Sequence, residues 1–175
     1  MGRGQNAHFA TGNGTTQPQG LATGAAAGPN MATANALTHD KLIDLLYSVD
    51  RAYRGSGSFL MNDETVAAAV KIKDTTNQYI WQPSVQAGEP DRLRGYPVVV
   101  CNEMASINAP GAAGTPLVLF GDLGRYMVRD VNSSMAVTRV NELGAASGQV
   151  GFVLLMRTDA RHIGHSGCVK ALLAV

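Results

Sequence analysis

Three residues near the end of the chain are of the types that bind metals. His162, His165 and Cys168 lie three positions apart in the segment RHIGHSGC at residues 161–168. Imidazole nitrogens and a thiolate are zinc ligands when a helix or a tight turn gathers them. Two glycines in this segment disfavour a helix, and the sequence shows no second group of ligands elsewhere. We therefore interpret the segment as a polar turn between two strands and expect no bound metal.

Asp122, in the segment FGDLG, is the best candidate for a catalytic carboxylate. A carboxylate serves as a general acid or base when a substrate lies within hydrogen-bond reach. Asp122 lies between two expected strands, however, where an aspartate commonly bonds to its own backbone in a tight turn. The chain also has no GxSxG motif for a nucleophilic serine. We interpret Asp122 as a turn residue and expect no catalytic residue.

The segment GNGTTQPQG at residues 12–20 is the candidate for a phosphate-binding loop. It lacks the Lys-Ser or Lys-Thr pair of a P-loop, and its glycines do not follow the GxGxxG spacing of dinucleotide-binding proteins. We therefore expect no nucleotide and no other cofactor. Its glycines and proline indicate turns, while the small and polar residues of 1–36 are also typical of a linker or a disordered tail. Both interpretations stay open at this point.

Tyr79 and Trp81, followed by Pro83, are the remaining candidates for a binding surface. Such a pair can form an aromatic platform, but it more often packs into the core on one face and contacts another subunit on the other. We favour the second interpretation.

Composition limits the classes of protein that fit this chain. Its 175 residues suit one compact domain or two small domains that share strands. Only 15% of residues are charged, below the usual value of about 25%. This low charge favours a protein whose surface is buried against other copies, although a small cytosolic enzyme would have a similar composition. The net charge of +1 argues against a dedicated nucleic-acid-binding protein. We expect no membrane segment and no signal peptide, and reduced thiols at Cys101 and Cys168 in an intracellular protein.

The first regular elements are expected after residue 37. Apolar residues recur at helical spacing from Thr38 to Gly55, with Thr38 as the N-cap. A short buried strand follows at residues 58–61, and Asn62 caps a second helix that ends near Lys73. The stripe of the first helix consists of Leu42, Leu45, Leu46, Val49 and Tyr53.

The rest of the chain predicts strands. We expect the run of valines in the strand at 96–101 to be buried on both faces. Strands and helices do not alternate in the βαβ order of a doubly wound fold, so the predicted class is α+β with a mixed sheet. The expected strands lie at 79–81, 96–101, 117–120, 126–131, 135–140, 150–157 and 169–175, with a turn at 142–149.

Six segments in this order resemble the major capsid proteins of tailed bacteriophages, which have the Hong-Kong-97-type fold. The segments are GNGTTQPQG, LIDLLYSVDRAYR, FLMN with the helix that ends in KIKD, YIWQPS, RGYPVVV and LFGDLGRYMVRDV. The resemblance covers nearly the whole chain and implies an axial domain at 34–122 and a remnant of the peripheral domain at 1–33 and 123–175. Capsid subunits usually carry an N-terminal arm, an E-loop and a long spine helix before this point. The resemblance therefore implies a C-terminal portion of such a subunit, without cross-linking residues, because FVLLM at 152–156 has no carboxylate.

The function that the resemblance implies is structural. Copies of the subunit would form hexamers and pentamers of an icosahedral shell around double-stranded DNA, in the virion and, during assembly, in the cytoplasm of a bacterial host. Scaffold, portal and decoration proteins are the other implied partners, with no sequence-specific nucleic-acid binding and no membrane. The loop at 102–116 is the best candidate to face a symmetry axis. Without its preceding segments, the chain alone is expected to be a monomer or a weak small oligomer.

Two alternatives come from other classes of protein. One is a small cytosolic α+β enzyme that uses Asp122, His162 or His165. The other is a non-catalytic oligomeric binding domain.

Overall fold

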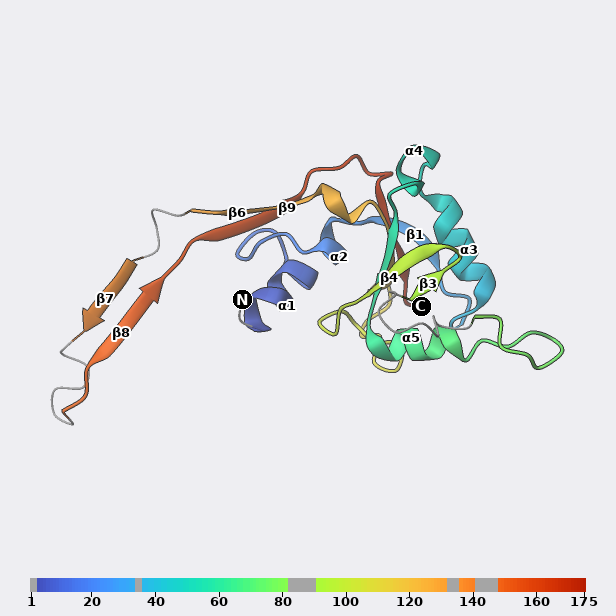
Figure 1. Ribbon diagram of the computed structural model, residues 1–175, viewed down its shortest axis with the longest axis horizontal. Helices are drawn as coiled ribbons and strands as arrows, with labels where there is room; N and C mark the ends of the chain where they lie inside the picture. The colour runs from blue at the N-terminus through green and yellow to red at the C-terminus, as the bar shows by residue number, and fades with distance from the viewer. Residues whose placement is uncertain (1–2, 34–35, 82–90, 132–135, 141–147) are drawn as a thin grey trace.

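The protein consists of a body built on one sheet and a long arm that extends from it (Figure 1). The arm is made of two short ribbons placed end to end, whereas the helices lie around the body and beside the root of the arm. The computed structural model describes residues 3–33, 36–81, 91–131, 136–140 and 148–175.

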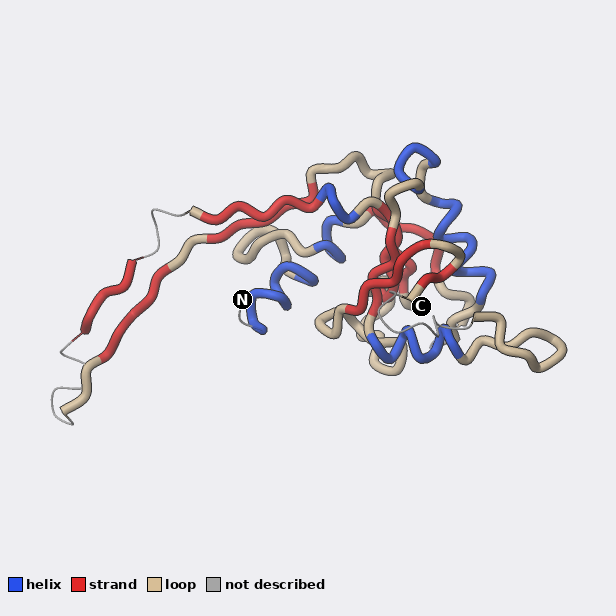
Figure 2. Tube along the Cα trace, in the orientation of Figure 1, coloured by secondary structure: helices blue, strands red, loops and turns tan. Residues whose placement is uncertain are grey.

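The central sheet of the body has six strands in the order β1-β10-β5-β2-β4-β3 (Figure 2). Two of its pairings, β1 with β10 and β2 with β4, are parallel, and the other three are antiparallel. The predicted α+β class with a mixed sheet is therefore confirmed. The strands are β1 (Ala26–Asn30), β2 (Ser58–Met61), β3 (Arg92–Leu93), β4 (Tyr96–Val100), β5 (Pro116–Gly121) and β10 (Val169–Leu173).

Strand β5 lies in the middle of the core. Its residues 117–120 are all fully buried, as the apolar run predicts. Phe120 packs against Phe59 of β2 with ring centroids 4.5 Å apart and the rings tilted by 38°, and Tyr96 of β4 meets Phe120 edge-on at 5.1 Å. Aromatic pairs at such separations add to the stability gained from burial alone. The three rings join the central strands on one face of the sheet.

The helix predicted from residue 38 is present but shorter than expected. Helix α3 (His39–Ser48) buries the leucines of the predicted stripe against β1, β10 and β5. It ends at Ser48, because Val49 turns to extended backbone and buries its side chain, and α4 (Arg51–Arg54) then begins. The side chain of Asp50 starts α4 by accepting a hydrogen bond from the backbone N–H of Ala52. The expected single helix to Gly55 is therefore wrong.

Helix α5 (Asp63–Val70) begins at the predicted cap. Asn62 Oδ1 accepts from the backbone N–H of Glu64 at 3.0 Å, while its Nδ2 donates to the carbonyls of Asn102 and Met104. The buried hydroxyl of Thr65 accepts from the N–H of Ile107. One end of α5 therefore fixes the start of the loop at 102–116.

Two strand predictions need correction. Residues 79–81 form no strand, since only Tyr79 bridges to Lys73. In β4 only Val98 is buried, while Val99 and Val100 are half exposed, so burial on both faces is wrong. Strand β4 lies near the edge of the sheet, next to a strand of two residues, and the described part of the chain leaves these two valines partly uncovered.

Residues 3–33 form regular structure, so the linker interpretation is wrong for them. Helix α1 (Arg3–Thr11) leads into the loop at 12–20, and α2 (Leu21–Gly24) follows. The loop closes on itself where Gly20 N–H donates to the carbonyl of Gly12 at 2.9 Å. A Cβ on either glycine would lie within 2.5 Å of backbone atoms, so this closure requires glycine at both positions.

The arm starts after β5, at a 3₁₀ turn, η1 (Leu123–Arg125). Its proximal ribbon pairs β6 (Tyr126–Asp130) with β9 (Thr158–His162), and its distal ribbon pairs β7 (Ala136–Val140) with β8 (Gly151–Leu155). Most of the expected turn at 142–149 and the bend at Pro83 lie outside the described residues.

The central sheet contains strands from segments that the resemblance placed in different domains. Strands β1 and β10 lie in the segments 1–33 and 123–175, which were expected in the peripheral remnant. Both belong to the central sheet, where β10 pairs with β5 over Val169–Leu173. Only the arm leaves the body as a separate feature (Figure 2).

Candidate functional site

Asp122 has the turn role that the sequence predicts. Its Oδ1 accepts from the backbone N–H of Gly124 at 3.1 Å, and its Oδ2 lies 3.3 Å from Nε of Arg125. These contacts begin η1 immediately after Gly121, whose φ is +150°. Both carboxylate oxygens are therefore used to turn the chain from the body into the arm.

None of His162, His165 and Cys168 lies on a helix. His162 ends β9, and His165 Nδ1 accepts from the N–H of Gly167 at 3.3 Å. Cys168 is buried beside β10, as a small core residue. Burial lowers the pKa of His162, which the nearby Asp122 partly opposes. No three metal-binding side chains come together within the described residues.

Tyr79 and Trp81 lie in different environments. Trp81 is only 7% exposed, and its Nε1 donates to the carbonyl of Arg92 at 2.8 Å. Tyr79 is 55% exposed, with the ammonium group of Lys73 5.0 Å from its ring centroid. The core role of Trp81 is confirmed, and a subunit contact through Tyr79 stays a prediction.

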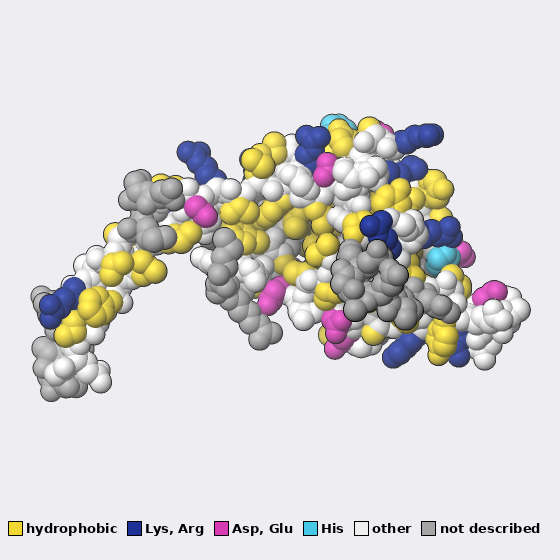
Figure 3. Space-filling view, in the orientation of Figure 1, with side chains coloured by type: hydrophobic (Ala, Val, Ile, Leu, Met, Phe, Trp, Pro, Cys, Tyr) yellow, Lys and Arg dark blue, Asp and Glu magenta, His cyan; other side chains and the backbone are white. Residues whose placement is uncertain are grey.

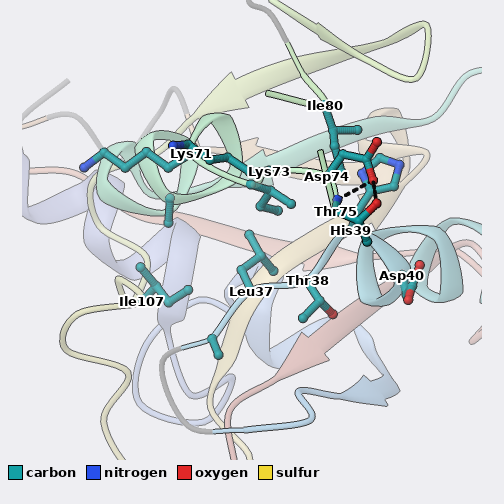
Figure 4. A pocket seen from close by; sticks show the side chains of 13 residues that line it. Leu37, Thr38, His39, Asp40, Lys71, Lys73, Asp74, Thr75, Ile80 and Ile107 are labelled. Atoms are coloured by element: carbon teal, nitrogen blue, oxygen red, sulfur yellow. Dashed lines mark hydrogen bonds between the residues drawn. The ribbon is translucent and has the colours of Figure 1, made fainter. Parts of the chain in front are cut away.

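The body has a hollow of about 610 Å³ between the start of α3 and the end of α5 (Figure 4). Leu37 and Ile107 give it apolar walls, and Lys71 lies on its rim. The carboxylate of Asp74 accepts from the backbone and the hydroxyl of Thr75, and these bonds lower its pKa. The carboxylate of Asp74 is thus used in contacts within its own turn.

His39, at the edge of the same hollow, contacts the hairpin between β3 and β4. Its Nε2 lies 2.9 Å from Nη2 of Arg94, a residue with φ of +55°. Burial lowers the pKa of His39, and the guanidinium of Arg94 lowers it further. A neutral imidazole is the form that can accept a hydrogen bond from Arg94.

The most unusual surface of the molecule is on the distal ribbon. Five of its large apolar side chains are 40–70% exposed (Figure 3). Single exposed apolar residues are ordinary, but neighbouring ones on both faces of a ribbon indicate surfaces that another protein segment covers. We call this group the distal apolar surface; it consists of Val137, Phe152, Val153, Leu154 and Leu155.

The root of the arm is fixed by the glycine-rich loop. Tyr126 donates from its hydroxyl to the carbonyl of Gln19 at 2.8 Å, and the N–H of Gln19 donates to Ala160 of β9 at 3.0 Å. The ring of Phe9 in α1 meets that of Tyr126 edge-on at 6.5 Å. Burial, with the nearby charge of Asp159, raises the pKa of Tyr126 to about 12, so the hydroxyl remains a donor at neutral pH.

Sequence reasoning found three of the four strands of the arm, but it missed β9 and the exposure of the distal ribbon. The signal available was the unbroken apolar run from Phe152 to Met156, which lacks the alternation of a strand with one face in water. Such a run indicates cover on both faces, and this cover is not present within the described chain.

No helix among the described residues combines the length and the apolar character needed to cross a bilayer.

The body contains a six-stranded sheet, whereas the apolar strands of the arm are uncovered within the described residues, a combination typical of a subunit of a larger protein assembly. The family model of the phage capsid family matches residues 1–170. The chain therefore belongs to the phage capsid family.

Solved structures that resemble the chain include capsids of GTA particles. The capsid of a native GTA particle is 28% identical, with a TM-score of 0.80 over 99% of this chain and 61% of that chain. The capsid of an empty GTA particle is 29% identical, with a TM-score of 0.75 over 99% and 62%. Gordonia phage Cozz, at 12% identity and a TM-score of 0.63 over 92% and 53%, shares the fold. The SrpI encapsulin of Synechococcus elongatus, at 14% identity and 0.62 over 94% and 59%, does so too.

These matches confirm the Hong-Kong-97-type fold that the six sequence segments indicated. The chain spans about three fifths of the length of the GTA capsid chains. No curated protein matches it significantly.

Proposed function

We propose that the chain is a structural subunit, a major capsid protein, of the shell of a tailed phage or prophage. Copies of it assemble into an icosahedral shell that encloses double-stranded DNA. The observation that carries this proposal is the family match over residues 1–170, together with a TM-score of 0.80 to a GTA capsid chain over 99% of this chain.

The physical features of the chain support a structural role. A subunit that tiles a shell needs a rigid body and surfaces that other copies cover. The aromatic core of the sheet provides the first, and the distal apolar surface is suited to the second. The net charge of +1 fits a container that holds DNA without binding it strongly.

The subunit carries out no catalysis in this proposal. The candidates of the enzyme alternative have structural surroundings: Asp122 caps η1, His162 ends β9, and His165 bonds within its own turn. All three residues lie at the junction between body and arm, and the contacts of Asp122 and His165 are local.

We assign the axial domain to residues 34–122 and the peripheral remnant to residues 1–33 and 123–175, with one change. Strands β1 and β10 go with the axial domain, because they complete its sheet. The remnant then consists of α1, the loop at 12–20, α2 and the arm. The loop at 102–116, held by Asn62 and Thr65, is the segment that faces the symmetry axis.

The partners in this proposal are first other copies of the chain, in hexamers and pentamers, and then scaffold, portal and decoration proteins. The mature location is the virion, and the cytoplasm of the bacterial host is where assembly takes place.

Particle composition tests the proposal. Particles are induced in cells that carry the gene, purified on a density gradient and analysed by mass spectrometry and electron microscopy. We expect peptides of this chain to dominate a fraction of closed, nuclease-resistant shells. A cytosolic control protein should be depleted from the same fraction. Recovery of the chain only from the soluble fraction, while shells of another protein form, would contradict the proposal.

A further inference from the structure

The loop at 12–20 contains the one Asn-Gly pair of the sequence, Asn13-Gly14. An asparagine followed by glycine is prone to spontaneous deamidation, because glycine has no side chain to hinder attack by its backbone nitrogen on the preceding side chain. Both residues are exposed to solvent, so water reaches them. The pair is therefore reactive by composition, and its surroundings determine how fast it reacts.

Deamidation at this pair has two steps and needs no reagent besides water. The backbone nitrogen of Gly14 attacks the side-chain carbonyl carbon of Asn13, a C–N bond forms, and the side-chain amide leaves as ammonia with the proton of the Gly14 N–H. Water then opens the succinimide ring. Hydrolysis of the new bond gives aspartate with the original backbone, whereas hydrolysis of the original peptide bond gives isoaspartate, whose main chain runs through the former side chain.

Four hydrogen bonds hold the side chain of Asn13, and we call them the Asn13 frame. Its Oδ1 accepts from the backbone N–H groups of Thr15, Thr16 and Gln17 at 3.1, 3.2 and 3.2 Å. Its Nδ2 donates to Oγ1 of Thr16 at 3.0 Å. All the partners follow Asn13 in the chain, so the frame fixes the amide group against the turn that comes after it.

The backbone of the pair is fixed as well. Asn13 forms an antiparallel bridge with Gln19, and Gly14 has a φ of +74°. Ring closure requires the nitrogen of Gly14 to turn toward the side chain of Asn13, whereas the extended backbone of a β-bridge turns this nitrogen away from it. The closed loop therefore keeps the two reacting atoms apart.

We propose that Asn13 is a site of spontaneous deamidation, and that opening of the loop at 12–20 sets its rate. The nitrogen of Gly14 reaches the side chain of Asn13 only when the frame and the bridge to Gln19 are broken. When opening and closing are fast relative to the chemistry, the observed rate is the intrinsic rate multiplied by the open fraction. The inference does not depend on the shell function, since it rests on contacts within one chain.

The aspartate product fits the closed loop. Three backbone N–H groups that converge on one oxygen bind a carboxylate more strongly than a neutral amide. The hydroxyl of Thr16 accepts from Nδ2 of Asn13, and it can donate instead to the second carboxylate oxygen of the product, since a hydroxyl is both donor and acceptor. Deamidation to aspartate therefore adds a negative charge to the loop without the loss of a hydrogen bond.

The isoaspartate product does not fit the closed loop. It adds a carbon atom to the main chain inside a loop whose closure leaves no space for a Cβ at Gly12 or Gly20. Gln19, at the other end of this loop, bonds to both strands of the proximal ribbon through its N–H and its carbonyl. Isoaspartate is therefore expected to displace Gln19 and to loosen the root of the arm.

The rate of deamidation at neutral pH tests the control by the loop. The folded chain and the same chain unfolded in urea are incubated side by side, and conversion at Asn13 is quantified by peptide mass spectrometry. The folded chain should react at least about tenfold more slowly, because the reaction needs a rarely populated open state. Thr16→Val removes the acceptor of Nδ2 and should speed the reaction of the folded chain about three- to tenfold. Thr15→Val is the matched control and should leave the rate unchanged, because Thr15 bonds to Asn13 through its backbone.

Two results would overturn the proposal. Equal rates in the folded and unfolded chain, or equal rates in Thr16→Val and Thr15→Val, would show that the loop does not control the reaction. The absence of conversion in both the folded and the unfolded chain would show that Asn13 is not a modification site. Circular dichroism of each variant confirms that a faster reaction is not a loss of fold.

The effect of each product on the arm is measured separately. Asn13→Asp reproduces the aspartate product and should leave hydrogen exchange in residues 126–130 and 158–162 unchanged. Aged protein enriched in isoaspartate, identified by electron-transfer fragmentation, should exchange faster in the same residues. Faster exchange in Asn13→Asp would contradict the fit of a carboxylate in the frame, and unchanged exchange in the isoaspartate form would contradict the loosened root.

Discussion

The hydroxyl of Tyr126 donates to the carbonyl oxygen of Gln19 at 2.8 Å, across 107 positions of sequence. This bond joins the first residue of β6 to a loop that is closed by Gly12 and Gly20. Gln19 also donates to Ala160 of β9, so both strands of the proximal ribbon are bonded to the same residue. The loop therefore determines where the arm leaves the body.

Removal of this hydroxyl should loosen the arm without unfolding the body. Tyr126→Phe should lower the free energy of unfolding by about 1 kcal/mol, the usual contribution of one hydrogen bond. Hydrogen exchange should become faster in residues 126–130 and 158–162 but not in β5. Tyr47→Phe, at an exposed tyrosine, is the control and should have little effect. Uniformly faster exchange across the chain would show that the bond supports the whole fold instead.

Asn62 should be among the most sensitive polar residues. Asn62→Ala removes the cap of α5 and leaves the carbonyls of residues 102 and 104 without their donor. We expect a loss of about 2–3 kcal/mol in urea-induced unfolding. Asn108→Ala, which removes only an exposed contact to Glu64, should cost less than about 0.5 kcal/mol. Similar losses for both variants would mean that Asn62 does not fix the loop.

Gly121 should tolerate no side chain. Its φ of +150° disfavours other residues, and an added Cβ would lie 2.1 Å from the carbonyl oxygen of Cys168. Gly121→Ala should therefore lower the free energy of unfolding by more than about 1 kcal/mol. Gly55→Ala is the control, because that site is helical and open, and it should be neutral or slightly stabilising. A thermal unfolding series that ranks the two variants in the opposite order would contradict this expectation.

Stability should fall when the pH is lowered past the ordinary histidine pKa of 6.5. Burial lowers the pKa of His162 and of His39 in the folded state. Below pH 6.5 the unfolded chain therefore binds more protons than the folded chain, so the stability present above this pH is lost as the pH falls. His162→Gln and His39→Gln should each reduce the fall in unfolding free energy between about pH 7.5 and 5.5, and the double variant should reduce it most. An unchanged slope in the double variant would contradict the assignment.

The segment from residue 38 to 70 could be predicted because its signals are local. The apolar stripe and the Asn62 cap specify helices through neighbours a few residues away. The break at Val49 could not be predicted from this pattern, since the side chain continues the stripe while its backbone turns to reach the core.

Other features depend on contacts that local patterns do not encode. Trp81 is held by a bond from its side chain to the carbonyl of Arg92, and no strand ladder is involved. The assignment of β1 and β10 to one sheet depends on pairing between residues more than 140 positions apart. The exposure of β8 could not be predicted, because an apolar run indicates that a strand is covered but not whether the cover belongs to the same chain.

The place of β10 between β1 and β5 has a consequence for biosynthesis. Residues 26–30 leave the ribosome early, but their partner strand at 169–173 is translated more than 130 residues later. At roughly 5–20 residues per second, β1 waits about 7–28 s before the sheet can close. Strand β5 is complete at residue 121, and until residues 169–173 follow, its apolar residues lack one of their neighbouring strands. The nascent polypeptide should therefore expose these apolar residues during translation, which favours its engagement by chaperones.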